Sequence, residues 1–432
     1  MILVVHTSAW TDRGLRRDDG NLFSGPSSGP LFIQRFALAL VWLGFALSGI
    51  VLAEPAPVDL ILILLIGLLP LAGLAEMNRT LLIYLMLWLL VVAGGCLGAM
   101  DAFDLGVASK QVGITLYLSV SSVILAGFIQ ANPAGHTRLI LNGYLVAAVV
   151  ATLAGLIGYF DLIPPLTETL TLYGRARGTF KDPNVYGAFV VPALVYALYL
   201  AFTSRPRTAL IALAVTGFLL LGSLLSFSRG AWTNAALSLA VFCYLSFVTS
   251  ASNRFRTRII ALLSVAAVLG TIVLAFAMQS PKVSELLTER AQLTQTYDSE
   301  PYGRFAGHAK AKALIVSHPF GIGPLQFGGN YHHEDVHQVY LNMLIGHGWL
   351  GGGAYILLVV LTLLLGIAGA FAPGPAQGLM LVMLSAYIGT VMEGFVVDTD
   401  HWRHFFVLMA AIWGLFLGSR PKSVGAHRSA PV

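Results

Sequence analysis

Charged residues are scarce in this sequence. They make up only 10% of its 432 residues, whereas hydrophobic residues make up 57%. Average soluble domains carry about 25% charged residues. A chain with so few charges lacks the polar surface that would keep it in water, and its mean hydropathy of +0.79 agrees. The composition therefore excludes an ordinary soluble domain and predicts an integral membrane protein.

Cysteine is also rare. The chain has only Cys96 and Cys243, and both lie inside apolar runs. Two such thiols form neither a disulfide framework nor a cysteine-based metal cluster. They are typical of thiols buried in a membrane bundle.

Apolar runs of about 20 residues, the length that a membrane-spanning helix needs, recur along the chain. We predict an all-α polytopic fold with about twelve such helices. They are expected at residues 31–52, 57–75, 80–99, 111–130, 138–160, 185–203, 208–225, 230–249, 259–279, 338–369, 375–397 and 403–418. The tenth run is overlong, so we expect it to begin as an interfacial or buried segment before Gly351.

Basic residues are unevenly distributed over the connections between these helices. If residues 1–30 form a disordered cytoplasmic tail, the cytoplasmic flanks hold fourteen of the 25 basic residues but only four of the 20 acidic ones. Cytoplasmic loops are enriched in Lys and Arg. We therefore predict helices one to nine over 31–279, one large external segment at 280–336, helices ten to twelve over 337–418, and a second cytoplasmic tail at 419–432.

The external bases are informative because basic residues are normally kept off that side. Arg229 lies in the short link Ser228-Arg229-Gly230 between two predicted spans. A charge at the membrane boundary is costly unless it meets a partner or a wet cavity. Arg229 could snorkel to the interface, or it could bind an anion in an outward-facing cavity, which we favour. A guanidinium suits a pyrophosphate because its planar fork donates paired hydrogen bonds and keeps its charge.

The external segment and the first residue after it carry five of the eleven histidines: His308, His318, His332, His333 and His337. Histidine suits proton abstraction from a sugar hydroxyl because its pKa lies nearest neutrality. Residues 398–404 add a polar stretch around Trp402, which fits either sugar contacts or a membrane-interface anchor.

Several of these motifs, taken in order, resemble the O-antigen ligase/polymerase superfamily of bacterial envelope biosynthesis. The resemblance covers residues 170–355. It is carried by R-A-R-G-T-F-K-D-P-N at 175–184, Ser228-Arg229-Gly230, Arg304, H-P-F-G-I-G-P at 318–324, H-Q-V-Y-L at 337–341 and G-H-G-W-L-G at 346–351.

The resemblance implies a multi-span fold of the GT-C type in the bacterial inner membrane with a periplasmic active site, and the loop charges predict that both termini are cytoplasmic. The resemblance also implies transfer of a glycan from undecaprenyl pyrophosphate to a sugar hydroxyl without metal or cofactor, and a one-step displacement would invert the anomeric configuration. Arg229 and Arg304 would hold the pyrophosphate, Arg175 or Arg177 would make a third contact, and His337 would be the base.

The acceptor would be lipid A-core for a ligase or the growing polysaccharide for a polymerase, and the sequence leaves this choice open. We expect no nucleic-acid partner. One departure from the family pattern is Gln338, where asparagine usually follows the histidine. The candidate acceptor contacts are His332, His333, Gln338, Asp400, His401 and Arg403.

Two functions from other classes stay open at this point. The string His333-Glu-Asp-Val-His337 matches H-E-x-x-H, the pattern of zinc proteases, which needs both histidines on one helix face. Asp398, Asp400 or His401 could then supply a third ligand. A basic external cavity could also belong to a transporter of lipid-linked oligosaccharides.

Overall fold

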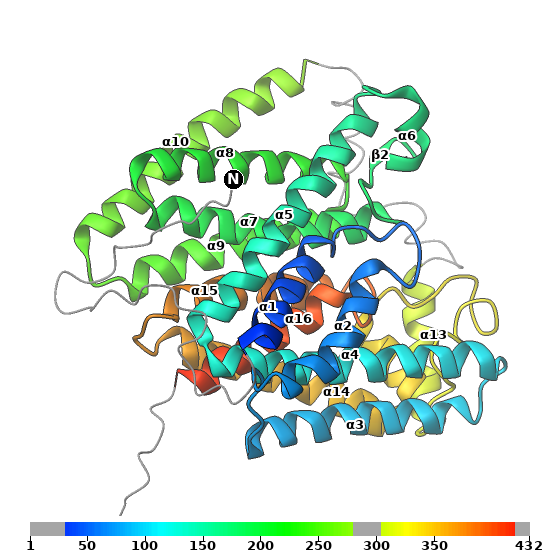
Figure 1. The fold of residues 1–432 in the computed structure, drawn as a ribbon. Helices are drawn as coiled ribbons and strands as arrows, with labels where there is room; N and C mark the ends of the chain where they lie inside the picture. The colour runs from blue at the N-terminus through cyan, green and yellow to red at the C-terminus, as the bar shows by residue number, and fades with distance from the viewer. Residues whose placement is uncertain (1–30, 280–303, 420–432) are drawn as a thin grey trace, which may run out of the picture.

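The chain is almost entirely helical in the computed structural model, which describes residues 31–279 and 304–419 (Figure 1). The helices are α1 (Leu31–Ala46), α2 (Pro57–Leu71), α3 (Arg79–Ala99), α4 (Leu105–Ala131), α5 (Pro133–Tyr159), α6 (Pro164–Leu170), α7 (Pro183–Thr203), α8 (Pro206–Leu225), α9 (Arg229–Thr249), α10 (Asn253–Ala277), α13 (Arg304–Ser317), α14 (Val339–Ala370), α15 (Gln377–Glu393) and α16 (Arg403–Gly418).

Each predicted span coincides with one of these helices. Within the described residues, eight helices are long and apolar enough to cross a membrane: α3, α4, α5, α7, α8, α9, α10 and α14. Four shorter apolar helices, α1, α2, α15 and α16, have 10–17 residues each. The protein is therefore a membrane-embedded helical bundle, as its composition predicts.

Three features differ from the sequence-based expectation. Helices α4, α5 and α10 begin earlier than predicted, because each takes up residues of the polar link before its apolar run. Strands β1 (Thr171–Leu172) and β2 (Arg175–Ala176) form a small antiparallel hairpin in an otherwise all-α chain. Part of the expected external segment is the helix α13. The tails at 1–30 and 420–432 and the stretch 280–303 lie outside the described residues.

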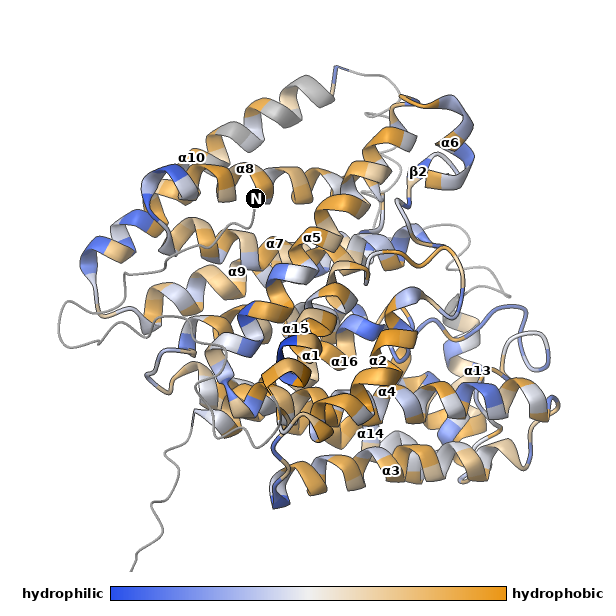
Figure 2. Cartoon of the chain, viewed as in Figure 1, coloured by the Kyte–Doolittle hydropathy of each residue, from blue (hydrophilic) through white to orange (hydrophobic). Residues whose placement is uncertain are grey.

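Helices from the two ends of the chain pack against each other. α3 packs on α14, α4 on α16, and α9 on α15, while α7 and α8 form a pair of their own. In Figure 1 the last helices lie among the first ones. Figure 2 shows mostly hydrophobic helix bodies, with hydrophilic residues at the start of α10 and around α6, β2 and α13.

The connections gather at two ends of the bundle. One end is joined by long-range contacts that include Val51 N–H to Thr179 O (2.8 Å), Asp104 N–H to Gln326 Oε1 (2.9 Å), Gln111 Nε2 with His401 Nδ1 (2.8 Å) and Arg175 Nε to Ser226 O (2.7 Å). The opposite end is joined by Asn78 Nδ2 to Gln130 Oε1 (2.8 Å) and Gln34 Nε2 to Ala72 O (3.3 Å). Alternate connections thus meet at opposite ends, as helices that cross a layer in turn require.

The overlong tenth run is broken inside α14. Gly348 has φ +65°, so Val339 to His347 forms a short helix before the main one begins. The loop before α14 fills the break, where Pro319 O accepts the Trp349 N–H at 2.9 Å. Small residues permit such close packing between membrane helices.

The glycines of α3 close the other side of this break. A Cβ at Gly94 or Gly98 would overlap the backbone of α14 at His347 or Gly346. The G-x-x-x-G motif of α3 therefore serves packing within the chain.

Gly348→Ala should lower the stability of the protein. A non-glycine residue at positive φ costs about 1–3 kcal/mol, and the new Cβ would lie 2.5 Å from Pro319 O. The change is measured as a lower midpoint of thermal unfolding in detergent.

Gly353→Ala is the matched control. It lies in the same helix, and a Cβ there meets nothing within 4 Å. Alanine in a helix interior should be neutral or stabilising by about 0.5–1 kcal/mol. Equal midpoints for the two variants would contradict the assigned role of Gly348.

Candidate functional site

The connection between α15 and α16, residues 394–402, is the meeting point of the polar motifs. The backbone N–H of Val339 donates to Gly394 O at 2.9 Å, which fixes the start of α14 there. A Cβ at Gly230 would lie 2.9 Å from Glu393 Oε1, so α9 begins beside the same connection. Asp398 completes the convergence, because its Oδ2 lies 3.5 Å from His337 Nδ1.

His337 is held by its backbone as well as by this carboxylate. Its φ is +48°, in the left-handed region that non-glycine residues rarely adopt, and such strain gathers at functional sites. Its side chain is 40% exposed, so it can meet a substrate. The next residue, Gln338, accepts the Leu341 N–H with its side chain and caps α14. This cap gives Gln338 a structural role at the start of the helix.

Two opposing influences act on the pKa of Asp398, the carboxylate partner of the His337 imidazole. Burial raises the pKa of its carboxyl, while the hydrogen bond with His337 opposes the rise. Its Oδ1 has no hydrogen-bond partner among residues 31–279 and 304–419. A carboxylate in this position can orient the ring and stabilise the imidazolium formed when the ring takes a proton.

Helix α13 reaches the same place from the other side. His308 Nε2 lies 2.8 Å from Val336 O, directly before His337. Arg304 is the first residue of α13, one turn before His308, and its side chain lies outside the described part of the chain. Helix α13 therefore contacts the segment that ends at His337, and the position of the Arg304 side chain stays a prediction.

Arg175 and Arg177, in the link before α7, make hydrogen bonds to different parts of the chain. Arg177 donates to the carbonyl oxygens of Glu168 and Thr169, both at 3.0 Å, and so folds the link onto α6. Arg175 reaches Ser226 O at 2.7 Å, three residues before Arg229. This geometry favours Arg175 over Arg177 as a further contact for a ligand beside Arg229, which is half-buried.

His332 and His333 differ in their surroundings. The ring of His332 is stacked on Phe327, with centroids 5.9 Å apart, and its Nδ1 lies 3.3 Å from the Glu334 N–H. His333 is exposed. Of the two, only His333 is presented to solvent as a contact for a large glycan.

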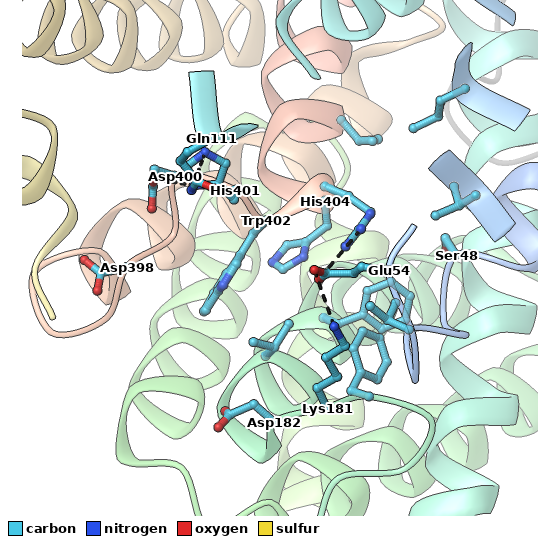
Figure 3. A pocket seen from close by; sticks show the side chains of 18 of the residues that line it. Ser48, Glu54, Gln111, Lys181, Asp182, Asp398, Asp400, His401, Trp402 and His404 are labelled. Atoms are coloured by element: carbon cyan, nitrogen blue, oxygen red, sulfur yellow. Dashed lines mark hydrogen bonds and ion pairs between the residues drawn. The ribbon is translucent and has the colours of Figure 1, made fainter. Parts of the chain in front are cut away.

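A cavity of about 290 Å³ opens beside this convergence (Figure 3). Its wall includes Asp398, so the partner of His337 belongs to it. The other polar and aromatic lining residues include Glu54, Gln111, Tyr144, Phe180, Lys181, Asp182, Phe189, Asp335, Asp400, His401, Trp402, Arg403 and His404. Three predicted acceptor contacts, Asp400, His401 and Arg403, therefore share one cavity.

Arg403 is fixed in this wall by a buried ion pair. Its Nε and Nη2 donate to the two carboxylate oxygens of Asp59 at 2.5 and 2.7 Å, and the Tyr117 hydroxyl donates to the same carboxylate. The paired geometry is the strong form of a guanidinium–carboxylate interaction. A second, more exposed pair joins Lys181 Nζ to Glu54 Oε2 at 3.4 Å.

Asp400 and His401 form a second carboxylate–imidazole pair, with Oδ2 and Nδ1 2.5 Å apart. Burial disfavours the charged form of Asp400 and so raises its pKa. The charge and the hydrogen bond of His401 favour the charged form more strongly, so the pKa of Asp400 is lowered. Gln111 and Thr115 of α4 hold the ring of His401 in turn. Figure 3 shows this group on one side of the cavity.

The zinc-protease pattern does not have the geometry that it needs. Residues 333–337 lie outside any helix, so the two histidines do not share a helix face. His333 is exposed, whereas His337 faces Asp398. In the described ranges, no group of three His, Cys, Asp or Glu residues is placed to hold a metal ion.

The sequence gives no role to Asp59, includes Lys181 only as part of the 175–184 motif, and offers Asp398 only as a zinc-ligand candidate and as part of the polar stretch 398–404. For Asp59 a signal was present, because a carboxylate within a predicted span requires a partner. The sequence does not show that this partner is Arg403, because the two residues are 344 positions apart.

No protein-family model matches the chain, and no curated protein is similar to it. A functional assignment therefore depends on the motifs and on the geometry of the site.

Asp59→Asn should destabilise the protein by about 3–5 kcal/mol, because it removes the carboxylate that pairs twice with the buried guanidinium of Arg403 and, within the described residues, leaves only Glu54 Oε1, 4.0 Å away. Asp59 is 5% exposed and Arg403 23% exposed. Thermal unfolding in detergent measures the change. Glu54→Gln is the control, because a half-exposed pair contributes at most about 1 kcal/mol. Similar losses in both variants would refute the special role of the Asp59–Arg403 pair.

Proposed function

We propose that the protein is a membrane glycosyltransferase of the O-antigen ligase/polymerase type, with a GT-C-like fold. It transfers a glycan from undecaprenyl pyrophosphate to a sugar hydroxyl at the periplasmic face of the bacterial inner membrane. The observation that carries this proposal is the His337–Asp398 pair beside a cavity. The start of α9, where Arg229 lies, packs against the same α15–α16 connection that carries Asp398.

The proposed reaction is a one-step displacement. The acceptor oxygen forms a bond to the anomeric carbon, while the bond from that carbon to the pyrophosphate oxygen breaks and its electron pair leaves with the pyrophosphate. His337 takes the hydroxyl proton, and Asp398 stabilises the imidazolium. Attack opposite the leaving group inverts the anomeric configuration. His337 returns to its neutral form by losing the proton to solvent or to the departing pyrophosphate.

The arginines support the other half of the reaction. Negative charge develops on the pyrophosphate as it leaves, and fixed guanidinium groups stabilise such charge without the need for a metal ion. Arg175 on β2 donates to Ser226 O, three residues before Arg229 at the start of α9. Arg304 at the start of α13 is the third candidate. We place both chain termini on the cytoplasmic side, so this end of the bundle faces the periplasm.

The acceptor decides between ligase and polymerase. Deletion of the gene from a bacterium that carries it, followed by gel analysis of the surface glycans, distinguishes them. Loss of all long glycan on lipid A-core indicates a ligase, whereas a single repeat unit on the core indicates a polymerase. An unchanged glycan profile would refute the proposed function.

His337→Ala should lower the rate of transfer by about 10²–10⁴-fold, the usual contribution of a general base, while donor binding persists. Asp398→Asn should lower it less. Because the pKa of Asp398 is raised, its carboxylate should be protonated at a higher pH than an ordinary aspartate, and wild-type activity should fall as the pH drops through the pKa of Asp398. The Asn variant should lose this contribution of Asp398 and keep only the fall that protonation of His337 causes. The rates are measured with purified protein and a synthetic lipid-pyrophosphate glycan.

His318→Ala is the control for this pair. The His318 imidazole contacts Leu314 O and Ser317 within its own helix turn, so the variant should keep wild-type activity. Full activity in His337→Ala would remove His337 from the mechanism.

Arg229→Lys separates the guanidinium fork from its charge. A lysine keeps the positive charge but loses the paired hydrogen bonds, so both donor binding and turnover should fall. Arg229→Ala should reduce both further. If the lysine variant binds donor and turns over like the wild type, Arg229 acts only as a general cation.

A further inference from the structure

The wall of the cavity is strongly acidic. Its five carboxylates belong to Glu54, Asp182, Asp335, Asp398 and Asp400, against the two permanent cations Lys181 and Arg403. Arg403 is also matched by the carboxylate of Asp59 outside the wall. An excess of carboxylates in a narrow cavity makes the local electrostatic potential more strongly negative. The cavity therefore repels an anionic group and is a poor site for a pyrophosphate.

One buried polar atom in the wall points to a hydroxyl-bearing ligand. His404 is 5% exposed, and its Nε2 has no hydrogen-bond partner within the described part of the chain. Buried polar atoms are nearly always paired. The ring lies between Trp402 and Phe189, at centroid distances of 5.1 and 6.1 Å. A ligand hydroxyl could donate to or accept from this nitrogen, depending on the tautomer.

The remaining wall is aromatic and the space is small. Trp402, Phe180, Tyr144 and Phe189 line it, and apolar faces with a few polar groups are typical of small-molecule sites. Its volume of about 290 Å³ is at the lower limit of such sites. It suits one or two sugar rings and is too small for a long glycan.

We infer that this cavity binds the acceptor sugar, and that it selects a sugar without acidic groups over a uronic acid or a sugar phosphate. This inference builds on the proposed function. Asp398 lines the cavity and its Oδ2 lies 3.5 Å from His337 Nδ1, so a sugar bound here would lie next to the carboxylate that holds the base. The two substrates would then bind at sites of opposite charge. The acceptor sugar would bind in the acidic cavity, and the pyrophosphate would bind at the arginines around Arg229.

The test is sugar binding to the purified full-length protein in lipid nanodiscs, measured by saturation-transfer NMR. The probes are methyl glucoside, its 2-amino analogue and its 6-carboxylate analogue. The carboxylate should bind about tenfold more weakly than the glucoside at low salt, a difference of 1.4 kcal/mol. This gap should narrow as salt screens the charges. Equal or tighter binding of the carboxylate, or no binding of any probe, overturns the inference.

Asp182→Asn with Asp335→Asn removes two charges and keeps the local structure. The Asp182 side chain accepts the Asn184 N–H at the start of α7, and that of Asp335 accepts the Gly328 N–H, which asparagine can also do. The double variant should bind the carboxylate probe about as well as the glucoside. An unchanged tenfold gap in this variant would contradict the electrostatic origin of the selectivity.

The matched control is Asp161→Asn with Glu168→Gln. Both residues are exposed, lie next to or in α6 and do not line the cavity, so the gap should persist. Trp402→Ala should lose binding of all three probes, which locates them in the cavity. If selective binding is found but no glycan transfer occurs, the proposed function fails, and the cavity remains a charge-selective sugar site that is not an acceptor site. If transfer occurs but sugars bind without charge selectivity, only the inference fails.

Discussion

The ion pair between Asp59 and Arg403 is the interaction on which the site depends. It joins α2 to the start of α16 across 344 residues of sequence. A charge buried at the edge of a membrane bundle is tolerated only with a partner, so each residue fixes the place of the other. Because Arg403 is fixed, the preceding connection is fixed as well. That connection carries Asp398, Asp400, His401 and Trp402 into the cavity wall.

The break in α14 complements this anchor. Gly348 ends the first short helix, and the loop that begins with Pro319 occupies the gap. Irregular backbone at membrane depth is stable only where protein or a cavity surrounds it. The glycines of α3 supply that cover by close packing. As a result the start of α14, with His337 directly before it, lies against Gly394.

Charge is separated within the polar end of the bundle. Carboxylates dominate the cavity, whereas Arg175 and Arg229 lie on the neighbouring turns of β2 and α9. Asp398 lines the cavity, and His337 lies against it outside the lining. This arrangement would let one small region bind a neutral sugar and a pyrophosphate at the same time, with the base beside the cavity. The same separation of charge would disfavour binding of the pyrophosphate in the acidic cavity and of the neutral sugar at the arginines.

Much of the fold could be predicted from the sequence, because hydrophobic length and scarcity of charge act locally. Each predicted span coincides with a helix, and the overlong tenth run is indeed interrupted, at Gly348. The starts of α4, α5 and α10 were placed too late, because caps such as Asp104 and Asn132 extend those helices into polar links. The β1–β2 hairpin has no hydrophobic period, so composition gave no sign of it.

The sequence by itself determined that the protein is a membrane bundle, and it singled out His337, Asp400, His401 and Arg403, because rare polar residues in an apolar chain are conspicuous. Only the tertiary structure decided their partners. Asp59 pairs with Arg403 and Asp398 faces His337 through contacts between segments that are remote in the sequence. Such pairings depend on which helices pack together, and the spacing of residues along one chain carries no record of that packing.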